Sequence, residues 1–294
     1  MKVSYNQGGW YDGDVSILKQ ASADMRKRLL ELYPVANLRK EFGQKGSKEE
    51  ISSALASSSD TQQLAAIADF VDENASFCKQ HVYVFSHTGD AVLPSGIPHG
   101  ELVKAEKDHA FYLVRIEYGV VKLDPLEHGS IEFLWPIRID LHQNYLLIRF
   151  VVLEKNIGSY FDRAVLLRGK SLSEETITSS VLADGTMGLA NLNKGFKALW
   201  QKDKIDAARV KYKKPGSVVI QSMDEEKGLK QFDTPAYEEL QKLPLYQSIF
   251  ISYRGFTEVG AFTADPTNGF IGFTRYFKEG ASGDELIRQI LANN

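Results

Sequence analysis

The chain of 294 residues is 43% hydrophobic and 25% charged, and its formal net charge at pH 7 is −3. Such a composition is typical of a folded protein with one large domain or two smaller ones. The slightly negative charge excludes a uniformly basic nucleic-acid coat protein, so any contact with nucleic acid must come from a local basic patch.

The sequence indicates a cytoplasmic protein without a membrane segment. Its one cysteine, Cys78, cannot form an internal disulfide, which fits a reducing compartment better than secretion. The N-terminus carries no apolar signal-peptide core. The longest apolar run, residues 145–153, is interrupted by Arg149 and is too short to span a bilayer.

Four short helices are predicted in residues 1–78, because hydrophobic residues recur there at helical spacing. Sequences of the capping-box type mark the starts of the third and fourth helices. The four segments begin near Ile17, Pro34, Ser47 and Asp60. Residues 1–78 are therefore predicted to form a small helical domain.

Residues 34–55 have a pattern of two short helices joined by a loop. Their apolar and loop positions are Val35, Leu38, Phe42, Gly46, Ile51 and Leu55, with Lys48 and Glu49 at the start of the second helix. This pattern resembles the SAP-type helix-loop-helix of DNA-binding proteins. The resemblance implies a module that touches the DNA backbone through Arg39, Lys40, Lys45 and Lys48. A plain structural pair of helices has the same spacing, and that alternative stays open.

From His81 the sequence changes to short β-prone runs separated by turn residues. Charged residues recur at two-residue spacing in these runs, as expected for a sheet with one wet face. The runs cover residues 81–87, 110–123, 130–140 and 144–155. They predict an antiparallel meander whose other face is covered by helices.

Residues 174–223 are predicted to contain two helices followed by a hairpin. The helices cover residues 174–182 and 189–201 and are separated by a break at Asp184 and Gly185. Two strands flank the Pro215-Gly216 turn, which gives the element order of a helix-turn-helix with a wing. Another helix from Thr234, three strands and a final helix to Leu291 follow.

The fold class predicted from this order is α+β. It comprises the N-terminal helical domain, an antiparallel β-sheet core, and a C-terminal helix-turn-helix with a basic hairpin and further strands. The predicted domains are residues 1–78 and 79–294, and the second has a possible subdivision into 79–170 and 171–294.

The segment Lys194 to Lys214 holds eight basic residues against two acidic ones. Arg209, Lys211 and Lys213 alternate with apolar residues, which would place three positive charges on one face of a strand. The residues predicted to contact phosphates are Lys194, Lys197, Lys202, Lys204, Arg209, Lys211, Lys213 and Lys214. The alternative is a solvated edge strand whose lysines prevent aggregation.

No catalytic residue, metal site or cofactor is predicted. The six histidines do not form a helical pair with a glutamate between them, and no P-loop sequence is present. Cys78 lacks an identifiable orienting group. Glu225 and Lys227 could serve a metal-dependent nuclease only with an upstream carboxylate, for which Asp162, Asp184 and Asp206 are the candidates.

The sequence therefore predicts a non-enzymatic nucleic-acid-binding protein that contacts duplex DNA through backbone charges. Two alternatives stay open: a protein-interaction subunit of a larger assembly, and the metal-dependent nuclease. A protein partner is expected only under the first of these alternatives, and no membrane partner is expected.

Overall fold

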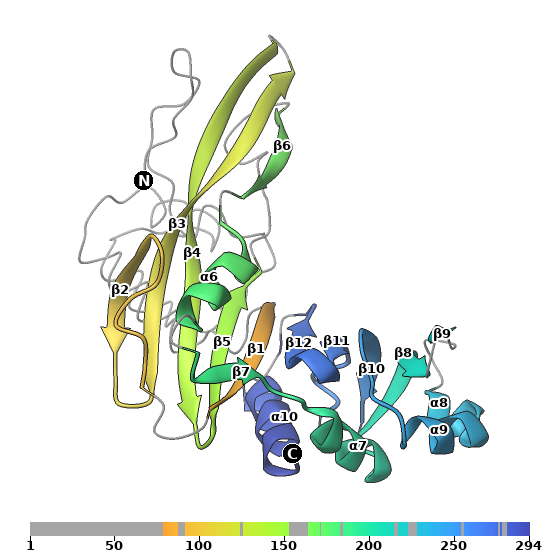
Figure 1. Ribbon diagram of the computed structural model, residues 1–294. Helices are drawn as coiled ribbons and strands as arrows, with labels where there is room; N and C mark the ends of the chain where they lie inside the picture. Colours follow the sequence, from red (N-terminus) through yellow and green to blue (C-terminus); the bar gives the residue numbers. More distant parts are fainter. Residues whose placement is uncertain are drawn as a thin grey trace, which may run out of the picture. The chain divides into compact units, whose positions relative to one another are not determined.

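The structure is a computed structural model of the chain (Figure 1). It describes residues 79–87, 92–123, 126–152, 164–170, 172–182, 185–214, 217–222, 228–253, 256–275, 277 and 281–294. The helices predicted in residues 1–78 lie outside the described residues. So does the SAP-like segment, with Arg39, Lys40, Lys45 and Lys48.

The described residues fall into two compact units. The first contains the described residues within Leu93–Arg138 and Phe150–Ala183. The second contains those within Asn74–Val92, Ile139–Arg149 and Asp184–Asn294. The predicted α+β class with an antiparallel sheet is confirmed.

An antiparallel sheet with one helix makes up the described part of the first unit. Its strands follow the order β2-β3-β4-β5, and β6 pairs with β3. The elements are β2 (Gly100–Ala105), β3 (His109–Leu123), β4 (Leu126–His142), β5 (Tyr145–Val151), β6 (Ala164–Lys170) and α6 (Glu174–Val181). The end of β4, the β4–β5 turn and the start of β5, within Ile139–Arg149, belong to the second unit. The meander predicted for β3, β4 and β5 is confirmed, whereas β2 and β6 are additional strands.

The core of the first unit contains the buried aromatic pair Trp135 and Phe150. Their ring centroids lie 5.1 Å apart, and the Trp135 Nε1 donates a hydrogen bond of 2.8 Å to the Val151 carbonyl oxygen. Helix α6 begins after Ser173, whose hydroxyl accepts a hydrogen bond from the Thr176 amide. The buried tryptophan therefore has both an aromatic neighbour and a partner for its polar group.

The second unit contains a longer antiparallel sheet with the order β1-β12-β11-β10-β8-β9, and β7 pairs with β1. The strands are β1 (Gln80–His87), β7 (Met187–Leu189), β8 (Ile205–Lys214), β9 (Ser217–Ser222), β10 (Ser248–Ser252), β11 (Ala261–Asp265) and β12 (Phe270–Phe273). The helices are α7 (Asn193–Gln201), α8 (Leu229–Phe232), α9 (Thr234–Leu240) and α10 (Ala281–Ala292), with a 3-10 turn at Pro266–Asn268. None of the helices described in the chain is long and apolar enough to cross a membrane.

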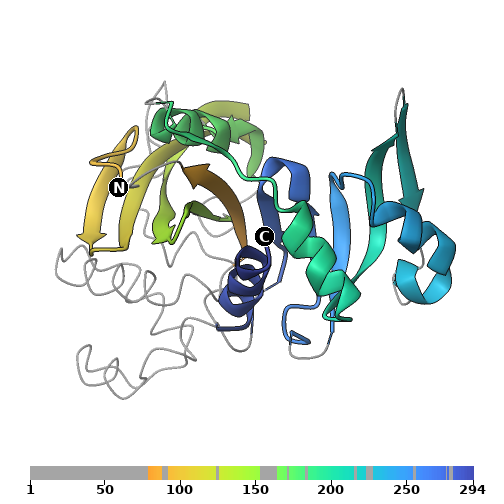
Figure 2. The same cartoon turned by 60° about the horizontal axis from the view of Figure 1, so that its bottom comes forward.

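All four helices described in this unit pack on one face of its sheet, which we call the inner face. The Phe196 ring of α7 lies 5.0 Å from Phe250 of β10, and residues of α8, α9 and α10 belong to the same buried cluster. Helices α7 and α10 lie side by side (Figure 2). They approach closely at Gly195, where a Cβ atom would come within 2.1 Å of the Ile290 carbonyl oxygen. We call the opposite face the outer face.

Two predicted connections differ from the structure. The run at residues 81–87 was expected to begin the meander, but β1 pairs with β12 from the end of the chain. The predicted helix-turn-helix is interrupted, because strand β7 lies between α6 and α7 and pairs with β1. Helix α7 consequently begins at Asn193 and not at Leu189. The predicted β8–β9 hairpin is confirmed by their antiparallel pairing.

A buried arginine joins α10 to the strands of the second unit. Arg149 Nε lies 2.6 Å from Asp140 Oδ2, and Nη1 lies 2.7 Å from Asp284 Oδ1. Burial alone would lower the pKa of Arg149, but the two carboxylates outweigh this effect and raise the pKa above its ordinary value. The arginine is therefore held as a cation with two partners.

Replacing Arg149 with alanine is expected to reduce the free energy of unfolding by about 3 kcal/mol, because the largely buried Asp140 carboxylate loses its partner. Urea unfolding followed by circular dichroism measures this loss. Arg288→Ala is the control, since its pair with Glu285 is exposed and should contribute less than about 1 kcal/mol. Equal losses in the two variants would contradict the assigned role of Arg149.

Candidate nucleic-acid interface

The basic strand β8 is an interior strand of its sheet. It pairs with β10 on one side, through Arg209 and Ile249, and with β9 on the other, through Arg209 and Ser222. Lysines that protect a sheet from aggregation are found on edge strands, where backbone groups are unpaired. The edge-strand explanation for the basic residues therefore does not apply to Arg209 and Lys211.

A β-bulge at Ala208 decides which face of the sheet these residues occupy. Phe250 pairs with Ala207 and Ile249 pairs with Arg209, so Ala208 has no partner on β10. Ala207 and Val210 both lie in the inner core although they are three residues apart. Strict alternation from Ala207 would have directed Arg209 inward, and the extra residue re-aims it to the outer face.

The predicted alternation along β8 is confirmed beyond the bulge. Val210 and Tyr212 are buried in the inner core, while Arg209 is exposed and Lys211 is half-buried. The Lys211 Nζ donates a hydrogen bond of 2.9 Å to Gln247 Oε1. The backbone of Lys213 and Lys214 continues the strand, and their side chains are outside the described part of the structure.

A shallow groove of about 540 Å³ lies on the outer face, and we call it the outer groove. Exposed Arg209 and Arg275 contribute its charged groups, and no acidic residue is among the described residues that line it. The Arg275 side chain packs against Gly260, whose φ of +64° favours glycine. A Cβ atom at position 260 would lie 3.0 Å from Nη1 of Arg275. The remaining lining residues are Ala208, Ile249, Ile251, Gly260, Ala261, Phe262, Thr263 and Thr274.

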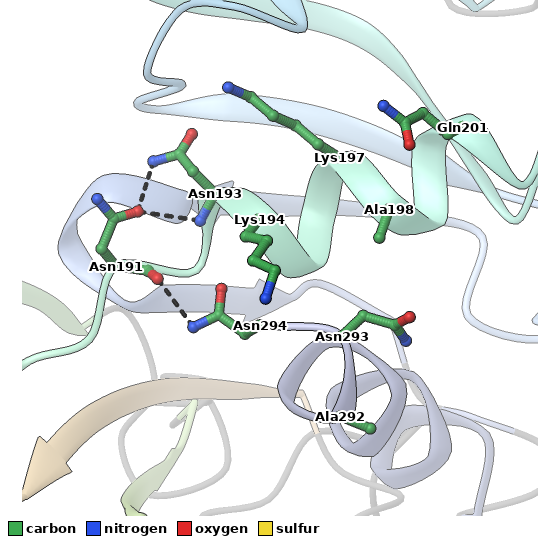
Figure 3. A pocket seen from close by; sticks show the side chains of 9 residues that line it. All are labelled: Asn191, Asn193, Lys194, Lys197, Ala198, Gln201, Ala292, Asn293 and Asn294. Carbon is green, nitrogen blue, oxygen red and sulfur yellow. Dashed lines mark hydrogen bonds between the residues drawn. The ribbon is translucent and has the colours of Figure 1, made fainter.

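A second groove, of about 850 Å³, lies between α7 and the end of α10, and we call it the helix groove (Figure 3). Its charged side chains are Lys194 and Lys197, and Lys194 extends from α7 toward Asn293 and Asn294. Burial lowers the pKa of Lys197. The other lining residues are Asn191, Asn193, Ala198, Gln201 and Ala292.

The amides of the helix groove already hold the start of α7. Asn191 Oδ1 accepts hydrogen bonds from the Asn193 amide at 3.1 Å and from Asn193 Nδ2 at 2.9 Å. Asn294 Oδ1 accepts one from the Gly195 amide at 3.2 Å, and its Nδ2 donates one of 2.9 Å to the Asn191 carbonyl oxygen. These contacts satisfy amides that a helix start leaves without partners.

The predicted basic residues of the C-terminal part do not form one continuous surface. Helix α7, on the inner face, carries Lys194 and Lys197, and Lys202 directly follows it. The outer face instead carries Arg209 and Lys211. Lys202 Nζ donates a hydrogen bond of 2.8 Å to Asn293 Oδ1, and Lys204 Nζ lies 5.9 Å from the centroid of the Phe256 ring. The sheet therefore separates the lysines of the helix from the basic side of the hairpin.

Of the residues named for a nuclease, only Asp206 lies in the described part of the chain. Glu225 and Lys227, like Asp162 and Asp184, lie outside the described residues. Asp206 is buried, and its Oδ1 accepts hydrogen bonds from Trp200 Nε1, the Ala207 amide and the Lys230 amide. Asp206 therefore has a structural role in joining α7, β8 and α8.

A cluster that the sequence did not suggest lies at the turn between β2 and β3 in the first unit. Ligand atoms of Glu106, Asp108 and His109 lie within 4.8 Å of one another. His109 Nδ1 is 3.7 Å from Glu106 and 3.5 Å from Asp108, and Lys104 Nζ is 3.3 Å from Glu106. Contacts within this exposed turn account for the cluster without an ion.

No protein-family model matches the sequence, and no match was found among curated proteins or solved structures. We therefore infer function from the residues and geometry of the chain alone. Arg275 is the residue that sequence reasoning missed. It follows an apolar strand, and only the tertiary structure places it in the same groove as Arg209.

Asn191→Ala is expected to reduce the free energy of unfolding by about 1 kcal/mol, because the first amide of α7 loses its acceptor. Asn191→Asp is the matched control, since it keeps the acceptor oxygen and should lose less. Urea denaturation measures both values. A larger loss for the aspartate variant would show that the Asn191 side chain does not act as a cap.

Proposed function

We propose that the protein binds nucleic acid through the phosphate backbone, with Arg209, Lys211 and Arg275 on the outer face as the primary contacts. One observation carries this proposal: a bulge in an interior strand directs Arg209 into a groove that it shares with Arg275. Bulges are enriched beside functional sites because they re-aim a side chain. An explanation from sheet protection alone does not account for that arrangement.

The chemistry of the groove suits a phosphate group better than a neutral ligand. Guanidinium groups present a planar fork of donors that matches phosphate oxygens in a bidentate manner, and Arg209 and Arg275 are both exposed. The local excess of positive charge provides the attraction that the overall charge of −3 does not.

Other predicted basic residues extend this proposal. The β8–β9 hairpin acts as a basic wing, with Lys213 and Lys214 toward its turn, and the SAP-like segment adds Arg39, Lys40, Lys45 and Lys48. Lys194, Lys197, Lys202 and Lys204 contribute long-range attraction, because the sheet keeps them from the stretch of backbone that Arg209 contacts. We place this function in the cytoplasm, in keeping with the single cysteine.

The proposal predicts a large effect from reversing charges on the outer face. Arg209→Glu combined with Arg275→Glu should weaken binding of an oligonucleotide at least about tenfold and lower the salt slope of log K by about 2, one for each lost phosphate contact. Fluorescence anisotropy over a series of salt concentrations measures both quantities. Circular dichroism confirms that the variant is folded.

Lys194→Glu with Lys202→Glu is the matched control, because it makes the same change of charge at two exposed residues of the inner side. We expect it to keep most of the affinity. If both double variants lose the same amount of affinity, the outer face is not the primary contact. Failure of the unchanged protein to bind DNA or RNA at low salt would overturn the proposed function and favour a protein partner.

A further inference from the structure

The outer face carries aromatic rings in addition to its arginines. Val82, Val84 and Ile271 lie in the inner core, so the residues that alternate with them project outward. These outward residues are His81 and Tyr83 on β1 and Phe270 on β12, and all three are half-buried. The Phe270 ring centroid lies 5.2 Å from that of Tyr83 and 5.4 Å from that of His81.

The Phe270 ring is folded along its own strand over Gly272. A Cβ atom at Gly272 would lie 3.0 Å from Phe270 Cζ and 3.2 Å from Cε1, so only glycine leaves space for the ring there. The Phe270 ring therefore lies over the backbone of its own strand, where it is half-buried. The Tyr83 and His81 rings are inclined to the Phe270 ring by 60° and 65°, so the three rings form an aromatic cluster on the outer face.

One row of paired residues runs across the sheet from His81, in the aromatic cluster, to Arg209. His81 pairs with Gly272, Gly272 with Thr263, Thr263 with Ile249, and Ile249 with Arg209. Four interstrand steps of ~4.8 Å separate the ends of this row, a span of roughly 19 Å. The outer groove covers the Arg209 end of this row, since Thr263, Ile249 and Arg209 line it.

We propose that the nucleic acid bound by the outer face is single-stranded, in place of the duplex DNA expected from the sequence. This inference rests on the proposed function and names its ligand: bases stack on Phe270 and Tyr83, while phosphates lie at Arg209 and Arg275. A duplex keeps the π-faces of its bases inside its own stack, so it offers a protein only its backbone and the edges of its bases. A single strand offers both the π-faces and the phosphates that this face can contact.

A structural role for the rings makes a different prediction from a binding role. Aromatic rings also cover glycines in sheets, and Phe270 covers Gly272 in this way. Leucine at position 270 would keep apolar cover but offer no π-face. Phe270→Leu therefore separates the two roles, and Tyr83→Leu with the matched control Tyr83→Phe does the same on the neighbouring strand.

The test compares a single-stranded oligonucleotide of about 12 nucleotides with a duplex of similar total charge, by anisotropy over a range of salt concentrations. The unchanged protein should prefer the single strand. Phe270→Leu and Tyr83→Leu should each weaken single-strand binding about tenfold without changing the salt slope, because stacking releases no counterions. Tyr83→Phe should behave as the unchanged protein, and all variants should keep its melting temperature within a few degrees.

The outcomes separate the two proposals. If the leucine variants bind like the unchanged protein while Arg209→Glu with Arg275→Glu loses binding, the proposed function stands and the single-strand inference falls. Preference of the unchanged protein for the duplex would overturn the inference in the same way. If neither oligonucleotide binds, both proposals are wrong, and the result favours a protein as the partner of the outer face.

Discussion

A row of buried aromatic rings determines the arrangement of the second unit. Ring centroids are separated by 5.0 Å between Phe196 and Phe250, 5.8 Å between Phe250 and Phe262, 6.0 Å between Phe262 and Phe273, and 5.1 Å between Phe273 and Phe277. The row joins α7 to strands β10, β11 and β12. A shift of one residue in any strand would move its ring out of the row, so the row fixes which residues face outward.

The same constraint explains the bulge in β8. Ala207 and Val210 both contribute to the inner core, and an unbroken strand could not bury both on one face. The extra residue at Ala208 resolves this conflict, and it leaves Arg209 beside Arg275 on the outer face. Packing on the inner face thus decides the position of charge on the outer one.

Sequence patterns predicted the elements whose signals are local. The runs that became β3, β4 and β5 are long and β-prone, and the β8–β9 hairpin has a Pro-Gly turn, so a short window was enough. The pairing of β1 with β12 could not be predicted, because the partners lie at opposite ends of the described chain. Strand β7 was missed for a related reason: it is only three residues long, and pairing with β1 forms it.

The candidate site shows the same division between local and distant signals. The alternation along β8 predicted that Arg209 and Lys211 share one face of the sheet. It did not reveal that α7 packs on the opposite face. Arg275 and Phe270 come to the outer face through the registers of β11 and β12, which long-range pairing sets. Since this face contributes nothing to the aromatic row, its charged and aromatic residues can change without opening the inner core. Substitutions on the outer face therefore test the proposed binding separately from stability.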